Sequence, residues 1–357
     1  MKIRTNLLAR IFNTTFNLDR WIDLVLQGLD ILFRHLTYSE VYELQMKIAI
    51  TGGTGFIGQL LIARHLVIGD EVLYLTRSKS KLASPAKPFI GELSDSADKL
   101  KDFMLGADVL YHCAGDIRNV SEMYATQVKG TQNLINAAKS RTGRWVQLRS
   151  VGAYGQHREV VITESTALNP SGQYEINKEA SDALVESASK SGAFSYFILR
   201  PSNVYGLAMS NQSLFGLIKA IKHKAFFFIG KCGASANYIH VDNVVEAMLL
   251  CAISPQAKGE IYNLSDYRTL EQFVAIVAKY LGVSVPLTRL PESLERLVAM
   301  LLKFVTKFPL TNARIDALTI LSSYSTEKIM RDLAYKPFVS MENGLKEMVD
   351  FFLQRQQ

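Results

Sequence analysis

Three residues near the middle of the chain have the types and the spacing of a proton-transfer centre. Tyr174 and Lys178 are four positions apart, so on a helix both side chains lie on one face. A tyrosine has an ordinary pKa of about 10, too high for a base at neutral pH, but a neighbouring lysine ammonium favours the phenolate and lowers that pKa. Ser150 ends a predicted strand and would hold a substrate oxygen by a hydrogen bond while Tyr174 moves the proton.

A glycine-rich turn near residue 50 is the strongest local signal in the sequence. Gly52, Gly55 and Gly58 are three positions apart, between a predicted strand at 47–51 and a predicted helix at 58–68. Glycines allow a tight turn and let main-chain amides approach a pyrophosphate at the N-terminus of the helix. Because a strand precedes the turn and a helix follows it, the pattern predicts a dinucleotide-binding site.

The end of the next predicted strand indicates which dinucleotide is bound. Arg77 lies about 20 positions past the glycines, where an acidic residue binds the ribose of NAD and an arginine accommodates the 2′-phosphate of NADP. Lys79 and Lys81 add positive charge nearby. The pattern favours NADP over NAD, and a solvated basic turn is the alternative.

The elements that must position these residues alternate along the chain. Predicted strands lie at 47–51, 71–76, 107–112, 144–149 and 194–199, with helices between them, notably at 123–140 and 174–191. Repeated strand–helix units predict an α/β fold of the Rossmann type, with a doubly wound parallel sheet. After Pro201 the alternation loosens into a smaller C-terminal substrate lobe. We therefore predict an amphipathic extension at 1–45, an NAD(P)-binding core at 46–200, and a region at 201–357 that is mainly substrate lobe, with some segments returning to the core.

Further motifs occur in an order that resembles the extended short-chain dehydrogenase/reductase family, of the NAD-dependent epimerase/dehydratase type. The resemblance covers about residues 47–353. It is carried by Thr51–Gly58 (TGGTGFIG), Glu92-Leu93, His112-Cys113-Ala114-Gly115, Gly130-Thr131-Gln132-Asn133, Ser150–Gly155, Tyr174 with Lys178, and Arg200–Gly206. Glu92 stands where the family has Asp, and Gly115 where it has Ala.

The resemblance implies roles for individual residues. Ser150, Tyr174 and Lys178 would be catalytic, with Lys178 also holding the nicotinamide ribose. The cofactor contacts it implies are Gly52, Gly55, Phe56, Ile57, Gly58, Arg77, Glu92, Leu93, Ala114, Gly115, Tyr174, Lys178, Pro201, Asn203 and Val204. Asn133 would either orient the lysine through a water molecule or pack its helix. No metal is expected.

The segments at 227–230, 238–244 and 333–340 are similar to the 3β-hydroxysteroid dehydrogenase and dihydroflavonol reductase branch. This implies hydride transfer to or from a carbonyl or alcohol carbon of a small or lipid-like substrate. One alternative is a nucleotide-sugar epimerase, dehydratase or reductase of polysaccharide biosynthesis, in which Lys219, Lys222, His223 and Lys224 would serve the diphosphate. Another is a cofactor-binding structural or regulatory protein without activity, against which the complete Ser150–Tyr174–Lys178 set argues.

Composition excludes several classes of protein. Of the 357 residues 48% are hydrophobic and 20% are charged, as in an ordinary globular chain. The net charge of +7 suits an anionic ligand, but no dense Lys/Arg block interleaved with aromatics predicts nucleic-acid binding. Three cysteines without CxxC spacing indicate reduced intracellular thiols. Without a targeting segment or a long apolar stretch, we expect a cytoplasmic enzyme whose partner is a small-molecule substrate.

Two amphipathic segments leave assembly and location open. Leu18, Ile22, Val25, Leu29, Leu32 and Leu36 have helical spacing before the fold begins at Met46, so we expect residues 1–45 to be dispensable for chemistry. The lobe, a second subunit of a homo-oligomer or a peripheral membrane contact could cover that stripe. Charges in 1–45 balance, which favours protein contact over anionic lipid. Residues 293–308 form a second such stripe, either a lobe helix over the pocket or an interfacial helix.

Overall fold

The computed structural model describes residues 45–78, 85–115, 123–138, 142–155, 160–170, 172–291, 293 and 318–355. These residues form two compact units. The first takes its described residues from 45–147 and 180–196, and the second from 148–179 and 197–355. The predicted helix at 18–36 lies outside the described residues, as does the one at 293–308 apart from Ser293.

The main sheet has seven strands in the order β11–β7–β5–β4–β1–β2–β3. Their bounds are β1 Lys47–Thr51, β2 Glu71–Thr76, β3 Lys87–Ile90, β4 Ala107–His112, β5 Thr142–Leu148, β7 Ser195–Pro201 and β11 Glu260–Leu264. β1 pairs in parallel with β2 and β4, β2 with β3, β4 with β5, and β7 with β11. The predicted Rossmann-type α/β fold with a parallel sheet is therefore confirmed.

Two strands of this sheet were not predicted. β3 has an exposed or half-buried residue at every position and contains Pro88, so it lacks the apolar run of a central strand. β11 lies beyond Pro201, in the region where the alternation loosens, yet it pairs with β7 in register from Glu260 opposite Phe197 to Leu264 opposite Pro201. The predicted boundary at residue 200 divides mainly cofactor-binding residues from mainly substrate-binding residues. That division of roles stays a prediction.

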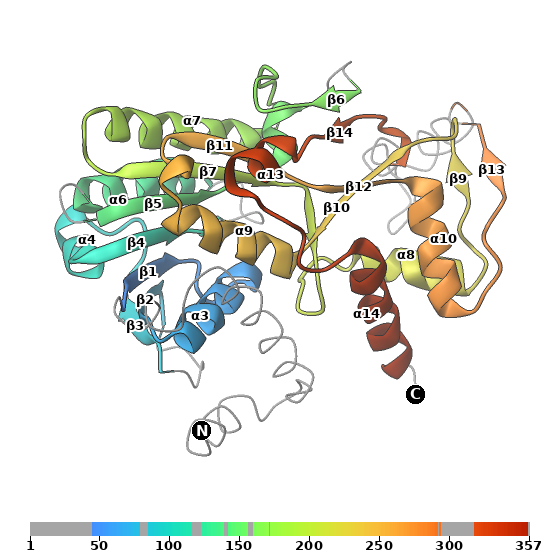
Figure 1. Ribbon diagram of the computed structural model, residues 1–357, viewed down its shortest axis with the longest axis horizontal. Helices are drawn as coiled ribbons and strands as arrows, with labels where there is room; N and C mark the ends of the chain where they lie inside the picture. Colours follow the sequence, from blue (N-terminus) through green and yellow to red (C-terminus); the bar gives the residue numbers. More distant parts are fainter. Residues whose placement is uncertain are drawn as a thin grey trace. The chain divides into compact units, whose positions relative to one another are not determined.

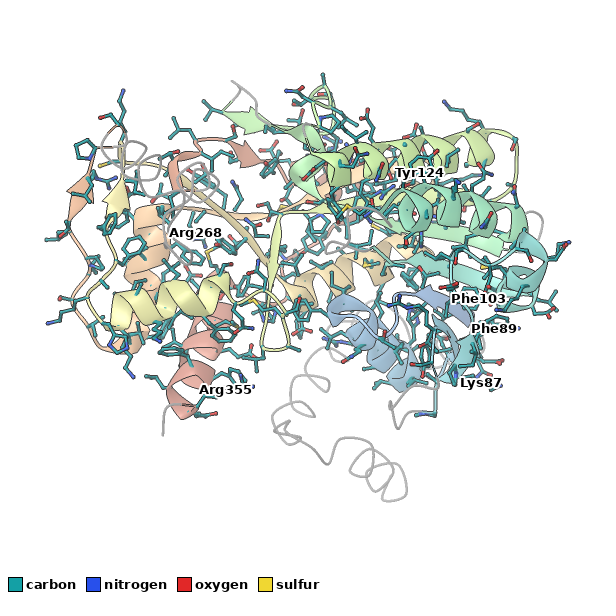
Figure 2. All side chains as sticks on the ribbon, turned by 180° about the vertical axis from the view of Figure 1, so that it is seen from behind. Lys87, Phe89, Phe103, Tyr124, Arg268 and Arg355 are labelled. Carbon is teal, nitrogen blue, oxygen red and sulfur yellow. The ribbon has the colours of Figure 1, made fainter. Side chains whose placement is uncertain are left out.

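Helices of the first unit pack directly on its strands. β1 is buried at every residue after Lys47, as expected for a parallel strand covered on both faces. α3 (Phe56–Ile68) packs on β1 and β2, and α4 (Ala97–Met104) packs on β2 and on α6 (Gly130–Ala138). Figure 2 shows Phe89 of β3 beside Phe103 of α4, with ring centroids 5.6 Å apart. These contacts place the N-terminus of α3 next to the end of β1.

The second unit carries smaller sheets and a group of helices. β12 (Asp266–Thr269), β10 (Ser235–His240) and β8 (Asn203–Tyr205) form one sheet, while β13 (Arg289–Leu290) pairs with β9 (Phe228–Ile229) and β14 (Ser323–Tyr324) with β6 (Val161–Ile162). α8 (Ser213–Lys222), α10 (Leu270–Leu281) and α14 (Met341–Gln354) pack together (Figure 1). Among the described residues, this unit also has α7 (Gln173–Lys190), which continues into the first unit, α9 (Val241–Ile253) and α13 (Glu327–Leu333).

Within the described ranges, no helix combines the length and the apolar sequence that a membrane crossing needs. The same part of the chain contains no group of three or more His, Cys, Asp or Glu side chains arranged to hold a metal ion. Cys251 is buried, Cys113 is half-buried and Cys232 is exposed.

Candidate active site

The glycine-rich turn joins β1 to α3 through close main-chain contacts. Gly52 has a φ of +72°, and a Cβ at this residue would lie 2.8 Å from the amide nitrogen of Ala114. A Cβ on Gly58 would lie 2.2 Å from the carbonyl oxygen of Gly52, and the amide of Gly55 donates to that oxygen at 2.9 Å. Side chains at Gly52 and Gly58 would force this main chain apart. The turn thus holds the N-terminus of α3, whose first amides have no partner within the helix, in a tight main-chain cradle.

The strand order puts this cradle at the switch point of the sheet. The chain builds β1, β2 and β3 outward on one side and then returns to β4 on the other side of β1. Thr51 and His112 are register partners at the carboxyl ends of β1 and β4. Open α/β sheets bind ligands outside the strand ends at such a point. The glycine turn and the Ala114–Gly115 segment both follow these two strand ends, so the residues present fit a dinucleotide.

A buried chain of hydrogen bonds supports the same strand ends. Thr131 Oγ1 donates to the carbonyl oxygen of Gln127, so it can only accept from His112 Nε2, at 3.0 Å. In the tautomer that carries the proton on Nε2, His112 Nδ1 accepts from Thr51 Oγ1, at 2.6 Å. Thr51 Oγ1 in turn accepts from the amide of Ala114 at 3.3 Å. This directional chain fixes the ends of β1 and β4 against α6.

The other cofactor candidates of the first unit lie at three places. Phe56 and Ile57 open α3, and Arg77 is exposed directly after β2. Leu93 is buried, whereas the side chain of Glu92 is exposed. Lys79 and Lys81, which add to the predicted charge near Arg77, lie outside the described residues.

Asn133 connects α6 to the turn after β3. Its Nδ2 donates to the main-chain oxygens of Leu93, at 3.2 Å, and Asp95, at 3.0 Å. Of the two alternatives for this residue, these bonds favour the one in which it packs its helix. The bonds also hold in place the turn that carries Glu92 and Leu93.

In the second unit, Ser150 begins a short 3₁₀ turn at the end of β5. The turn covers Val151–Tyr154, and Ser150 Oγ accepts from the amide of Gly152 at 3.1 Å. A hydroxyl that accepts this bond keeps its own proton available to donate to a substrate oxygen. The position agrees with the predicted strand end.

Tyr154 anchors this turn in the interior. Its ring is fully buried, and its hydroxyl donates to Asn263 Oδ1 at 2.8 Å and accepts from Arg200 Nη1 at 3.1 Å. Glu164 Oε1 accepts from the amide of Asn263 at 2.8 Å. The turn that carries Ser150 is therefore tied to β7 and β11, which supply Arg200 and Asn263.

Tyr174 and Lys178 lie on successive turns of α7. The Nζ of Lys178 is 5.6 Å from the centroid of the Tyr174 ring, so the predicted common face is observed. Burial raises the pKa of the Tyr174 phenol, the positive charge of Arg149 opposes this effect, and the carboxylate of Glu175 adds to it. For proton transfer at neutral pH, the phenol needs further positive charge beside it.

Arg149 is a residue of this site that the sequence analysis missed. It is 7% exposed and lies between β5 and Ser150, and its Nη2 donates to the main-chain oxygen of Lys178. Its own amide donates to Leu199 of β7 at 2.8 Å. The signal in the sequence was a charged side chain next to the candidate serine, at the end of an apolar strand.

The last three cofactor candidates lie close together in the second unit. Pro201 ends β7 and is buried, and Asn203 and Val204 belong to β8. Asn203 Nδ2 donates to the main-chain oxygen of Asn237 at 3.1 Å. The structure therefore gathers Ser150, Tyr174, Lys178, Pro201, Asn203 and Val204 in the second unit, and the glycine turn with Arg77, Glu92, Leu93, Ala114 and Gly115 in the first.

Two known proteins are similar to this chain in sequence over most of their length. A ketoreductase of Stigmatella aurantiaca that acts on 4-hydroxy-2-methyl-3-oxo-4-farnesyl-3,4-dihydroquinoline-1-oxide is 28% identical, over 84% of this chain and 95% of its own. The 3β-hydroxysteroid dehydrogenase/decarboxylase isoform 1 of Arabidopsis thaliana is 24% identical, over 88% and 81% respectively.

A solved structure shares the fold. The UDP-glucuronic acid 4-epimerase of Bacillus cereus, in complex with NAD, has a TM-score of 0.67 and 18% identity, covering 87% of this chain and all of that one. Residues 48–265 match the family described as the NAD-dependent epimerase/dehydratase family, more than half of the chain. The chain therefore belongs to that family of NAD(H)-binding enzymes, within the extended short-chain dehydrogenases/reductases.

Proposed function

We propose that this enzyme transfers a hydride between a nicotinamide cofactor and a carbonyl or alcohol carbon of a small or lipid-like substrate. The observation that carries the proposal is the placement of Lys178 Nζ 5.6 Å from the Tyr174 ring on one face of α7. In this proposal residues 46–200 mainly bind the cofactor and residues 201–357 mainly bind the substrate.

The chain's own groups would handle the proton and the oxygen. When bound, the cofactor supplies the acceptor or donor of the hydride. In the oxidative direction, the phenolate of Tyr174 takes the proton of the substrate hydroxyl as the hydride leaves its carbon. Ser150 Oγ–H donates to the same oxygen, and the ammonium of Lys178 stabilises the phenolate. In the reductive direction, the Tyr174 phenol gives its proton to the carbonyl oxygen.

The relatives support a lipid-like substrate. The ketoreductase of Stigmatella aurantiaca acts on a compound that carries a farnesyl group, and the Arabidopsis thaliana enzyme is named for 3β-hydroxysteroids. Both names describe an oxygen-bearing carbon on a largely apolar molecule. An apolar substrate of this kind is the class that we propose for this chain.

A nucleotide-sugar substrate is the second candidate, and basic residues at the end of α8 favour it. Lys219, His223 and Lys224 are exposed there, and the side chain of Lys222 lies over the Phe352 ring at 5.6 Å. Exposed cations can bind a diphosphate. The Bacillus cereus structure of similar fold is named for UDP-glucuronic acid.

A substrate panel tests the proposal. Purified chain is given NAD or NADP with farnesylated ketones, 3β-hydroxysteroids and dihydroflavonols in one set, and UDP- and dTDP-sugars in the other. Reduction or oxidation is followed by the absorbance of the nicotinamide, and sugar products by chromatography. Turnover of an apolar ketone or alcohol supports the first candidate. Turnover of nucleotide sugars alone replaces it with the second.

Cofactor choice gives a prediction for Arg77, the exposed residue after β2. We propose that its guanidinium binds the 2′-phosphate of NADP. Arg77→Asp should then weaken NADP binding strongly, because a carboxylate repels the phosphate, and should leave NAD binding intact or improve it. Titration of both cofactors by calorimetry measures this. Lys87→Asp, on the neighbouring β3, is the charge-matched control. An unchanged ratio of the two dissociation constants in Arg77→Asp would contradict the proposal.

A further inference from the structure

Arg149 lies between the end of β5 and Ser150 and contacts α7, the helix that carries Tyr174 and Lys178. Arg149 is more than nine-tenths buried, so its guanidinium lies mostly out of water. Its Nη2 donates to the main-chain oxygen of Lys178, one turn after Tyr174. Its amide is held by Leu199 of β7. One residue thus joins the end of β5, the adjacent strand and the first turns of α7.

We propose that Arg149 is a positioning residue of this active site, which holds the first turns of α7 against the end of β5 beside Ser150 and presents its charge to Tyr174. The inference rests on the proposed function of Ser150, Tyr174 and Lys178. It adds a buried cation to that set, one that needs no contact with substrate or cofactor.

The charges around Tyr174 support the electrostatic part of this role. Arg149 is the cation that lowers the pKa of the Tyr174 phenol most, against the effects of burial and of the Glu175 carboxylate. Lys178 is the other cation near the ring. Lys178 sits on a flexible stem, whereas the main-chain contact fixes the guanidinium of Arg149. A fixed charge stabilises the phenolate without reorganisation during the reaction.

The test places a single reporter at the tyrosine. Tyr174→3,5-difluorotyrosine gives a more acidic phenol, and its fluorine resonance reports ionisation while the chain stays folded. The pH midpoint of phenol ionisation is measured with NAD present. The proteins compared are the parent, Arg149→Met, Arg149→Gln and Arg149→Lys, each with the fluorinated tyrosine at position 174. We expect a higher midpoint in Arg149→Met and Arg149→Gln, because removing a positive charge disfavours the phenolate. Arg149→Lys keeps the charge and should stay near the parent.

Two further variants serve as controls. Arg200→Met removes another buried arginine, 2% exposed, whose guanidinium donates to Tyr154. It should lower the melting temperature but leave the midpoint unchanged. Glu175→Gln removes the carboxylate that raises the pKa of Tyr174, so its midpoint should fall. Together these controls separate an effect on Tyr174 from a general loss of stability.

Kinetics measure what the loss of this charge does to turnover. With native Tyr174, Arg149→Met should lower kcat for alcohol oxidation at neutral pH by about 10-fold or more, since one nearby opposite charge commonly changes a pKa by about one unit or more. The pH at which kcat rises should move upward, and the dissociation constant of NAD should stay unchanged. A purely structural arginine would change the melting temperature and leave the pH profile in place.

The outcomes are distinct. A parent-like midpoint in a folded Arg149→Met or Arg149→Gln variant would overturn the inference. So would failure of both variants to fold, which would assign Arg149 to stability alone. The proposed function fails separately, if the parent does not bind a nicotinamide cofactor or if Tyr174→Phe retains full turnover. Neither of those results depends on Arg149.

Discussion

Tyr174→Phe should lower kcat by roughly 10²–10⁴-fold, the usual contribution of a general acid or base. The substitution removes only the hydroxyl that exchanges the proton and keeps the ring beneath Lys178 Nζ. The dissociation constants of NAD and NADP should therefore stay close to those of the parent. Steady-state kinetics on a substrate identified by the panel, together with cofactor titration, make the comparison.

Two variants sharpen this test. Tyr267→Phe removes a hydroxyl from a tyrosine of β12 that is 40% exposed, and it should keep parent-like turnover. Lys178→Met should lower kcat and also weaken cofactor binding, because we assign this ammonium to the nicotinamide ribose as well as to Tyr174. Wild-type turnover by Tyr174→Phe would remove this residue from the mechanism and leave the proposed proton transfer without its donor.

Gly58→Ala should abolish or strongly weaken cofactor binding. The added Cβ would lie 2.2 Å from the carbonyl oxygen of Gly52. This oxygen belongs to the main chain, so it cannot move aside as the end of a flexible side chain can. Overpacking of this kind costs about 1–3 kcal/mol. If the main chain of the cradle shifts to relieve this overlap, cofactor binding becomes weaker. The dissociation constant then rises about tenfold for each 1.4 kcal/mol of binding free energy that is lost. Calorimetric titration with NAD and NADP measures the effect.

Gly216→Ala is the matched control for Gly58→Ala. Gly216 lies inside α8, where a Cβ would have nothing within 4 Å. Alanine is the better helix former, by about 0.8–1.0 kcal/mol, so this variant should melt at a higher temperature and bind cofactor as the parent does. If Gly58→Ala also bound cofactor with parent affinity, the glycine turn would not be the cradle that we propose.

The sequence alone determined the local parts of this protein. The apolar runs at 47–51, 71–76 and 107–112 became β1, β2 and β4 with the predicted bounds. The glycine turn could be recognised because the conformation of a turn depends on a few neighbouring residues. Tyr174 and Lys178 could be paired in advance because their spacing of four matches the helical repeat, whatever packs on that helix.

Only the tertiary structure decided how distant segments meet. Nothing in the sequence indicated that Arg149 would reach the main chain of α7, or that Thr51, His112 and Thr131 would form one hydrogen-bonded chain. Asn133 could not be assigned until its amide was seen on the turn after β3. β11 joins β7 across some 60 residues of intervening chain, and its short run is too brief to identify by periodicity. Helices, strands and turns follow from the periodicity and conformation of neighbouring residues, which the sequence shows directly. Contacts between distant segments depend instead on the order in which the strands join the sheet, because that order decides which side chains are buried together.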